Sequence, residues 1–373
     1  MSRTRVGIVG TVGIPANYGG FETFTEQLVS HTGNGDVDYT VFCSSRAYYQ
    51  KLNQYKGARL RYIPLKANGL QSILYDAVSL AKATRSNDAV LLLGVSGCIF
   101  LPLWRLFSKK KLIVNIDGLE HRRAKWGNLT RRFLRLSEKL AVRHADIVVA
   151  DNRGIQDYVM SEYGVPSELI EYGGDQAIIY ANKEDDDRVL ANLGVTPGSY
   201  ALAVSRMEPE NNPEMILEAF SRMPDFKLIY VSNWDANDYG RELKLKYGHH
   251  PNLILHDSTY EIASLNALRN NCRAYVHGHS AGGTNPSLVE AMFTGKPILT
   301  YDCSYNRETT EHNALYFDGS ASLEAILREL DPEKANAIGE AMQETAHRRY
   351  TWHTITRKYL HLFLSPKKSK ISR

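Results

Sequence analysis

The sequence predicts an α/β protein built from two open domains, each with a parallel sheet covered by helices. The first observation is a repeated rhythm of short apolar runs and helical segments along the whole chain. The second is that several of these runs are apolar on both faces, which is typical of parallel strands buried by helices. The third is length, because 373 residues exceed one ordinary domain and suit two, of roughly 150 to 200 residues each.

In the first half, six apolar runs are predicted to be strands. The run RVGIVG ends in a glycine and is followed by helical spacing over residues 21–31. Gly173-Gly174-Asp175 gives a turn signal where the pattern restarts, so we place a domain boundary at residue 176. The predicted strands cover residues 5–10, 37–44, 59–65, 89–94, 111–117 and 145–151.

The second half repeats the scheme. A strand over residues 199–205 precedes a helix over 213–223 that starts on proline, a favoured first helical position. The runs KLIYVSN, LILHDS, AYVHGH and PILTYD follow as strands. The aromatic-rich segment 344–363 is predicted to be helical and to cross back onto the first domain. The expected division is therefore residues 1–176, residues 177–345, and a crossover helix with a basic tail over 346–373.

Composition indicates a globular protein of a reducing cytoplasm. Apolar residues make up 43% and charged residues 23%, both ordinary values. No apolar run approaches the length of about eighteen residues that a membrane span needs, and the N-terminus carries no signal-peptide pattern. The four cysteines lie far apart without metal-site spacing, so each is expected to be a buried apolar residue: Cys43, Cys98, Cys272 and Cys303.

Positive charge is concentrated in the first half of the chain. Up to Gln176 there are 23 basic and 16 acidic residues, which gives +7, and the remainder has 22 and 25, which gives −3. The densest basic stretch is residues 122–143, preceded by Trp104 and Phe107 beside three lysines. This stretch is either a surface for an anionic membrane leaflet or a solvated helix face. No nucleic-acid-binding motif accompanies it, so nucleic acid is not an expected partner.

Residues 277–290, HGHSAGGTNPSLVE, contain the G-x-S-x-G pattern of a serine esterase. A nucleophile elbow needs a helix directly after the serine, whereas the helix signals here come later. Thr284 or Asn285 is the expected N-cap and Pro286 suits the first turn, which leaves Ser280 in a loop. A serine hydrolase is therefore kept as a lesser alternative.

The same loop has the features of an anion site. Gly282 and Gly283 allow close approach of the backbone to a ligand, and the following helix start directs N–H groups and a positive dipole end there. His279 adds a further donor, although a tight turn with no ligand is the alternative. Neither G-x-G-x-x-G nor G-x-x-x-x-G-K-[ST] occurs, which disfavours dinucleotide oxidoreductases and P-loop kinases.

Five ordered blocks together resemble the retaining family-4 glycosyltransferases of the GT-B architecture, and are most similar to the rhamnosyltransferase branch of bacterial surface-polysaccharide synthesis. The resemblance covers nearly the whole chain. It implies two facing Rossmann-like domains, a nucleotide-sugar donor held mainly by the second, an acceptor held mainly by the first, and no metal. The blocks are GTVGIPANYGGFETF (10–24), VNIDGLE (114–120), VSRMEPENNPEMILEAF (204–220), HGHSAGGTNPSLVEAM (277–292) and YDCSYNRETT (301–310).

In the second domain, the resemblance implies that Arg206 neutralises the diphosphate leaving group and that Glu290 binds the donor ribose. Gly282 stands where the wider family has the first glutamate of an E-x7-E pair. Asn211 stands where many relatives have a lysine. The alternative for Arg206 is a surface ion pair with a nearby glutamate, Glu208 or Glu210. Further donor contacts are expected from His279 and from the main chain of Gly283, Thr284, Ser287 and Leu288.

In the first domain, the resemblance points to the loops after two strands. Gly19 and Gly20 open a helix and are expected to approach the diphosphate or the sugar. Glu22 is expected to cap the first turn of that helix, with contact to the acceptor as the alternative. Asp117, at the carboxyl end of its strand, is placed to orient or deprotonate the attacking hydroxyl, with a structural turn aspartate as the alternative. Glu120 and His121 are substitutes for that role.

The expected function is transfer of L-rhamnose from dTDP-β-L-rhamnose to a polyprenyl-diphosphate-linked sugar, with retention, in capsule, O-antigen or cell-wall synthesis. The protein is expected to be cytoplasmic, peripheral on the inner face of the plasma membrane through its basic first domain, and to need no cofactor. The alternatives are another donor such as UDP-GlcNAc or UDP-glucose, or a non-catalytic scaffold at the membrane.

Overall fold

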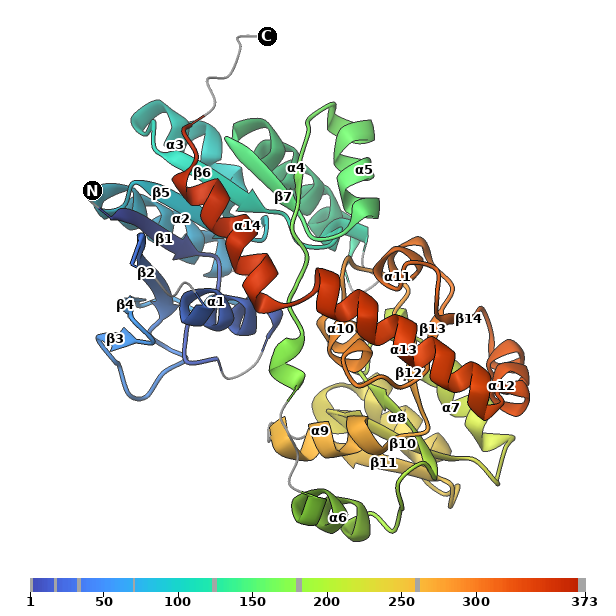
Figure 1. Cartoon of the computed structure of the whole chain (residues 1–373). Helices are drawn as coiled ribbons and strands as arrows, with labels where there is room; N and C mark the ends of the chain where they lie inside the picture. The colour runs from blue at the N-terminus through green and yellow to red at the C-terminus, as the bar shows by residue number, and fades with distance from the viewer. Residues whose placement is uncertain are drawn as a thin grey trace. The chain divides into compact units, whose positions relative to one another are not determined.

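The computed structural model describes residues 3–16, 19–31, 35–69, 71–122, 126–178, 183–258 and 262–367. Two compact α/β units make up the chain (Figure 1). Unit 1 is Met1–Tyr172 with Trp352–Arg373, and unit 2 is Gly173–Thr351. Each unit is a Rossmann-like domain with a predominantly parallel sheet, so the predicted fold class is confirmed.

Unit 1 contains an eight-stranded sheet in the order β3-β4-β2-β1-β5-β6-β7-β8. All neighbours are parallel except the short β3, which is antiparallel to β4. Strands β5 and β6 are buried at every residue, as expected for runs that are apolar on both faces. The strands are β1 Thr4–Val9, β2 Val37–Ser44, β3 Gln54–Tyr55, β4 Ala58–Ile63, β5 Ala89–Leu93, β6 Lys111–Asn115, β7 Ile147–Ala150 and β8 Glu168–Leu169. The helices are α1 Gly20–His31, α2 Gln71–Ser86, α3 Leu101–Phe107, α4 Asn128–His144, α5 Arg153–Tyr163 and α14 Trp352–Leu364.

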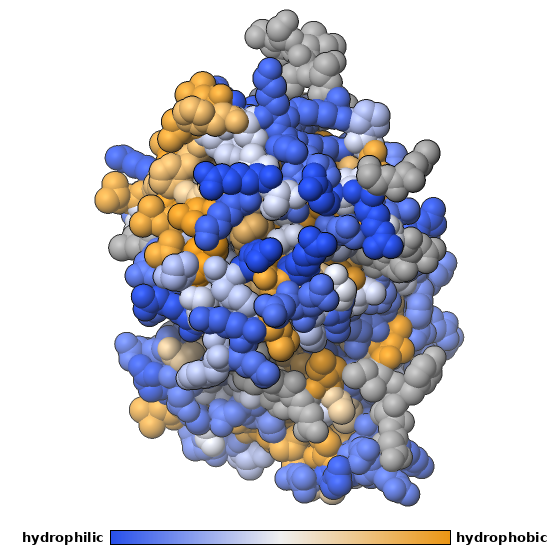
Figure 2. All heavy atoms as spheres, turned by 90° about the vertical axis from the view of Figure 1, so that its left-hand side faces the viewer, coloured by the Kyte–Doolittle hydropathy of each residue, from blue (hydrophilic) through white to orange (hydrophobic). Residues whose placement is uncertain are grey.

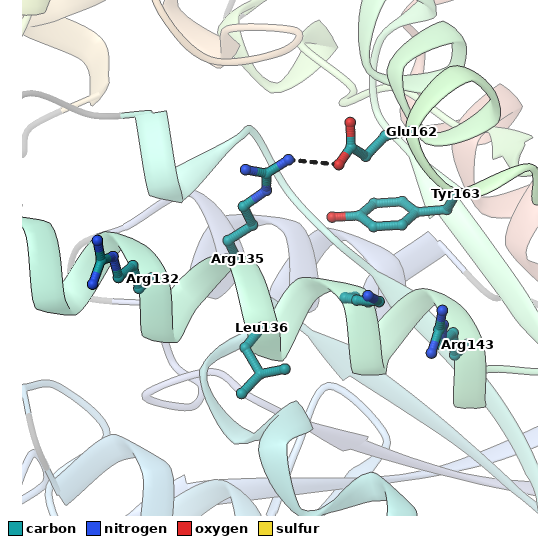
Figure 3. A pocket seen from close by; sticks show the side chains of 7 residues that line it. Arg132, Arg135, Leu136, Arg143, Glu162 and Tyr163 are labelled. Atoms are coloured by element: carbon teal, nitrogen blue, oxygen red, sulfur yellow. Dashed lines mark hydrogen bonds and ion pairs between the residues drawn. The ribbon is translucent and has the colours of Figure 1, made fainter.

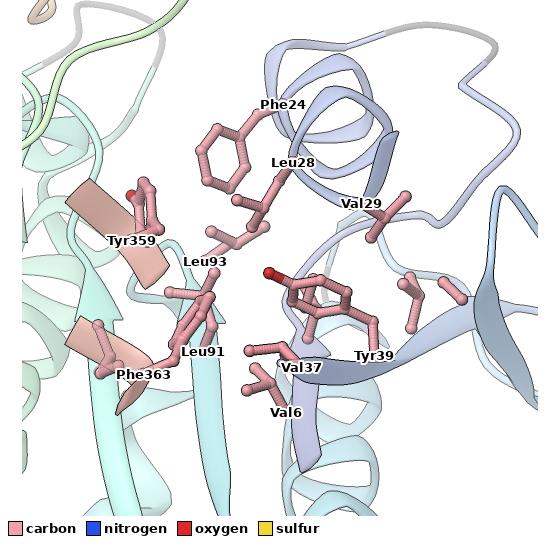
Figure 4. Packing of buried hydrophobic residues seen from close by; sticks show 14 of the residues in the cluster. Val6, Phe24, Leu28, Val29, Val37, Tyr39, Leu91, Leu93, Tyr359 and Phe363 are labelled. Carbon is pink, nitrogen blue, oxygen red and sulfur yellow. The ribbon is translucent and has the colours of Figure 1, made fainter. Parts of the chain in front are cut away.

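Helix α14 completes the core of unit 1, which confirms that the end of the chain returns to the first domain. Its aromatic side chains meet those of α1 and β2 over the sheet (Figure 4). The ring centroids of Phe24 and Tyr359 are 5.1 Å apart, and those of Tyr39 and Phe363 are 6.1 Å apart. The predicted helix over 344–363 is two helices, however, because the chain leaves helical geometry at Tyr350 before α14 begins.

A buried lysine fixes the end of α14 to the sheet. Lys111 of β6 is only 7% exposed, and its ammonium group donates to the carbonyl oxygens of Leu362 and Ser365, the latter at 2.6 Å. Burial lowers the pKa of Lys111. A cation at the carboxyl end of a helix satisfies terminal carbonyl groups and complements the helix dipole. The basic tail after Lys367 lies outside the described residues.

Unit 2 contains a six-stranded parallel sheet in the order β11-β10-β9-β12-β13-β14. Its strands are β9 Tyr200–Val204, β10 Lys227–Ser232, β11 Leu253–Asp257, β12 Ala274–His277, β13 Ile298–Tyr301 and β14 Leu315–Phe317. Its helices are α6 Lys183–Asn192, α7 Pro213–Ser221, α8 Asp238–Tyr247, α9 Ile262–Asn271, α10 Pro286–Met292, α11 Ser304–Thr309, α12 Ser320–Glu329 and α13 Pro332–Arg349.

The division between the units falls at Tyr172 and at Thr351, rather than at residues 176 and 345 as the sequence suggested. Gly174 explains the first difference because it packs within unit 2. Its N–H donates to the carbonyl oxygen of Tyr350 at 2.9 Å, and a Cβ added there would lie 2.7 Å from Cγ1 of Val289. The turn therefore belongs to the unit that follows it.

None of the described helices combines the length and the apolar character that crossing a bilayer requires.

Candidate functional site

The sheet of unit 2 reverses its strand order at β9, which lies between β10 and β12. In open α/β sheets, ligands bind beyond the carboxyl ends of the strands at such a point. The loop after β9 carries Arg206, and the loop after β12 carries His279, Gly282 and Gly283. The fold thus brings together two blocks of sequence that were predicted separately.

Hydrogen bonds join these two loops. The backbone N–H and the hydroxyl of Ser280 both donate to the carbonyl oxygen of Glu210, at 2.8 and 2.9 Å. The side-chain amide of Asn212 donates to the carbonyl oxygen of Gly278 at 2.8 Å. A Cβ at Gly278 would lie 2.2 Å from the carbonyl oxygen of Asn211, so the close approach requires glycine. The two loops act as one structural element.

The position of Ser280 disfavours the esterase interpretation. Its hydroxyl proton is directed to a backbone carbonyl, and helix α10 begins only at Pro286. Asn285 is the N-cap, because its Oδ1 accepts from the N–H of Ser287 at 3.1 Å. Ser280 is therefore a loop-joining residue without the strand-to-helix elbow of a nucleophile.

Arg206 is exposed, and its backbone is held in place. Its carbonyl oxygen accepts from the buried side chain of Asn211 at 2.8 Å and from the N–H of Glu208 at 2.9 Å. Within the described residues, its guanidinium forms no ion pair with Glu208 or Glu210. Asn211 thus holds the backbone of Arg206 in place through its side-chain amide. The exposed guanidinium is available to bind an anion.

The glycine-rich loop has an open side. Gly282 has a φ of +122°, a conformation that suits glycine, and no atom lies within 4 Å of where its Cβ would be. Gly283 follows it, and Thr284 is 3% exposed. The N–H groups of Ser287 and Leu288 donate to Asn285 of the cap, to Oδ1 and to the carbonyl oxygen respectively. A ligand that uses these two donors would replace or share the contacts of Asn285.

Glu290 is held by two residues that sequence reasoning missed. Its carboxylate accepts from Nε2 of Gln176 at 2.8 Å and from Nη2 of Arg269. The side chain of Arg269 is 4% exposed and that of Glu290 is 19% exposed, so the ion pair is largely buried. The partners lie 114 and 21 residues away along the chain, and no local pattern could have revealed them.

Two histidines form a stacked pair at the start of the loop. The rings of His277 and His279 lie 4.3 Å apart with an interplanar angle of 9°. His277 is 1% exposed, and among the described residues neither of its ring nitrogens has a hydrogen-bond partner. Burial lowers the pKa of His277 to about 3, so the ring is neutral at physiological pH.

This histidine predicts a loss of stability in acid. Since the folded pKa is about 3 and the unfolded value is about 6.5, only the unfolded chain binds the proton between these values. The free energy of unfolding should therefore fall by up to about 1.4 kcal/mol per pH unit as the pH drops below about 6.5. In His277→Phe, urea unfolding between pH 7.5 and 5.5 should show a shallower pH slope. The exposed His353→Phe should keep the wild-type slope, and equal slopes for all three proteins would contradict the assignment.

In unit 1, the candidate residues lie at the carboxyl edge of the sheet. Asp117, just after β6, has a φ of +59°, which is unusual for a non-glycine residue. Its N–H donates to Oδ1 of Asn115 at 2.9 Å, and the amide of Asn115 donates to the hydroxyl of Tyr359 at 3.0 Å. Residues held in such conformations gather at functional sites. Helix α14 thus supports the Asp117 loop from within the same unit.

Gly19 and Gly20 lie where the loop after β1 enters α1. Gly19 has a φ of +124°, and a Cβ there would lie 2.0 Å from Oε2 of Glu22. Gly20 is the first residue of α1, with open space around its Cβ position. Glu22 is 7% exposed and accepts from the N–H of Val12 at 2.7 Å, so it closes the loop. Among the described residues, the hydrogen bonds of the Glu22 carboxylate thus come from Thr11 and Val12 of the preceding loop, rather than from the first turn of α1 as expected for a cap.

The two substitutes for Asp117 both have partners in unit 1. Glu120 accepts from the indole nitrogen of Trp126 at 3.1 Å. Nδ1 of His121 lies 3.0 Å from the carboxylate of Glu138, which is 1% exposed. These contacts hold both side chains within their own unit.

Comparisons with known proteins bear on both halves of the chain. A domain of unknown function, DUF1972, matches residues 3–175, and the family model "Glycosyl transferases group 1" matches residues 192–345. No curated protein sequence matches the chain.

Solved structures match over nearly the whole length. Sucrose-phosphate synthase of Thermosynechococcus elongatus is 15% identical with a TM-score of 0.79, and the match covers 97% of this chain and 98% of that one. HepE of Anabaena, in complex with UDP and glucose, is 18% identical with a TM-score of 0.78, covering 98% and 100%. A glycosyltransferase of Rickettsia africae is 13% identical with a TM-score of 0.74, covering 97% and 98%. At these identities the likeness concerns the fold, which is that of GT-B glycosyltransferases.

Proposed function

We propose that the chain is a group 1 glycosyltransferase, since that family model matches residues 192–345 and DUF1972 matches residues 3–175, and that it transfers L-rhamnose from dTDP-β-L-rhamnose to a polyprenyl-diphosphate-linked sugar. The product has the same anomeric configuration as the donor. This reaction serves the synthesis of a capsule, O-antigen or cell-wall polysaccharide. The enzyme works on the cytoplasmic side, attached to the inner leaflet through unit 1, and needs no metal.

The observation that carries the proposal is the pairing of the β9 and β12 loops in unit 2. It places an exposed guanidinium, Arg206, on the same joined element as an open glycine-rich loop and the start of α10. Positive charge and N–H donors gathered at a strand-order reversal suit a diphosphate. Arg206 stabilises the negative charge that develops on the diphosphate as the bond to the sugar breaks.

Glu290 supplies the contact to the ribose of the donor. A carboxylate has about four lone-pair directions, and Gln176 and Arg269 use two of them. The remaining two suit the two hydroxyl groups of a ribose. Gly283, Thr284, Ser287 and Leu288 give main-chain donors to the diphosphate and sugar, while His279 adds a side-chain donor.

Unit 1 supplies the acceptor side. Asp117 orients the attacking hydroxyl, and Gly19 and Gly20 allow the transferred sugar and the diphosphate to approach the loop after β1. The acceptor attacks the face from which the diphosphate departs, which gives retention. The unusual backbone conformation of Asp117 and the open space at Gly20 support this proposed role of unit 1.

The test should also include a UDP-sugar as the donor, since HepE of Anabaena has the same fold and was solved with UDP and glucose. The melting temperature should be measured with dTDP, UDP and GDP, because a ligand that binds the native state raises it. Release of dTDP from dTDP-rhamnose should then be followed with and without a lipid-linked acceptor. A shift with dTDP and turnover of dTDP-rhamnose are expected. A shift with UDP alone would replace the donor by a UDP-sugar, and no shift with any nucleotide would favour a non-catalytic scaffold.

A further inference from the structure

Helix α4 presents a stripe of four cations. Their spacing along α4 places them on one face of the helix, and all four side chains are exposed. Like charges one turn apart destabilise a helix by a few tenths of a kcal/mol per pair. An arrangement that costs stability in the isolated protein suggests an anionic partner. The stripe consists of Arg132, Arg135, Lys139 and Arg143.

The acid on α4 does not neutralise this stripe. Glu138 is 1% exposed and accepts hydrogen bonds from the hydroxyl groups of Tyr158 and Tyr163, at 2.9 and 2.7 Å. It also contacts His121. Its charge is thus directed into the unit, away from the exposed cations.

The stripe lines a pocket of about 380 Å³ between α4 and α5 (Figure 3). Leu136 of α4 and two side chains of α5, Glu162 and Tyr163, complete its lining. Glu162 accepts from Nη2 of Arg135 at 2.6 Å. Four of the residues that line the pocket are cations and one is a carboxylate, so the lining itself is predominantly basic.

Exposed apolar side chains lie on α4 and on its neighbour α3. Phe107 and Leu129 are each 83% exposed, and Leu106 is 77% exposed. Figure 2 shows hydrophobic side chains gathered beside hydrophilic ones on the upper part of the surface. A site for a soluble phosphate does not require exposed apolar side chains beside it. A lipid headgroup does, because its phosphate lies directly above acyl chains.

We propose that the pocket between α4 and α5 binds the phosphodiester of an anionic phospholipid headgroup, while Leu106, Phe107 and Leu129 enter the leaflet beside it. This extends the placement at the inner leaflet given above and is independent of the donor site in unit 2. Arg132 and Lys139 hold the phosphate, and Arg143 adds positive charge at the end of the same stripe. Glu162 competes with it for Arg135 and so limits the affinity.

Vesicle sedimentation of the full chain tests this assignment. Wild type should bind vesicles of phosphatidylcholine that contain roughly 30 mol% phosphatidylglycerol, and should bind vesicles of pure phosphatidylcholine only weakly. The variant R132Q/K139Q/R143Q should have a roughly 100-fold lower partition coefficient, since each basic residue near an anionic surface contributes a factor of about five. The control K51Q/R59Q/R61Q removes three exposed cations from another part of unit 1 and should bind as wild type.

Glu162→Gln gives a test that loss of folding cannot imitate. Removing the internal competitor should raise the partition coefficient about fivefold. Unchanged or weaker binding of this variant, or equal binding of wild type to both vesicles, would overturn the proposal. Displacement from vesicles by millimolar glycerol 3-phosphate would instead show a soluble phosphate site, and displacement by single-stranded RNA a nucleic-acid surface. The nucleotide-induced shift in melting temperature, measured on each variant, reports separately on the donor site.

Discussion

Arg206→Ala is expected to lower kcat by about 100- to 1,000-fold, the usual effect of removing one group that stabilises developing negative charge. The guanidinium is exposed and, among the described residues, has no ion-pair partner. Its removal should therefore leave the melting temperature close to that of wild type. Turnover of dTDP-rhamnose at saturating donor measures the effect, and the melting temperature reports on folding.

Two control variants make the Arg206 result specific. Arg206→Lys keeps the charge but loses the planar fork that binds two phosphate oxygens, so an intermediate kcat is expected. Arg222→Ala removes another exposed arginine of unit 2, one that pairs with Glu218 one turn away on α7, and should leave kcat unchanged. A kcat of Arg206→Ala within a few-fold of wild type would remove Arg206 from the reaction.

The longer strands of both sheets could be predicted because a strand that is buried on both faces is a continuous run of apolar residues. The runs at β5 and β6 are continuously apolar, and both are buried throughout. Strands β3 and β8 have only two residues each, which is too short for an apolar run, and they were not predicted. The break between α13 and α14 was also missed. Tyr350 is fully buried and its hydroxyl donates to the carbonyl oxygen of Thr309 at 2.9 Å, a long-range contact that the sequence does not reveal.

The candidate site was predictable where its chemistry is local. The glycines at 282 and 283 and the later helix start indicate an anion site from sequence alone. The order of strands in the sheet is not local information, so the joining of the β9 and β12 loops through Ser280 emerged only from the fold. The same holds for Gln176 and Arg269, which no sequence pattern connects to Glu290.

Arg269→Leu is expected to lower the free energy of unfolding by about 3 kcal/mol. The substitution leaves the carboxylate of Glu290 largely buried without its cation, and breaking a buried pair costs about 3–5 kcal/mol. The lower end of that range applies because Glu290 is 19% exposed and keeps the hydrogen bond from Gln176. Urea unfolding at pH 7.5 measures the change. Arg269→Lys should recover part of the loss, since it keeps the charge but not the fork geometry.

The double variant R269L/E290Q separates stability from donor binding. Replacing the carboxylate by a neutral amide removes the buried uncompensated charge, so most of the lost stability should return. Nucleotide affinity should not return, because the amide oxygen has two lone-pair directions, one of which accepts from Gln176, so that it can accept from only one ribose hydroxyl. Recovery of stability without recovery of the nucleotide-induced shift in melting temperature would support a contact between the carboxylate of Glu290 and the ribose. Recovery of both would make the pair purely structural and would require the ribose contact to come from another side chain.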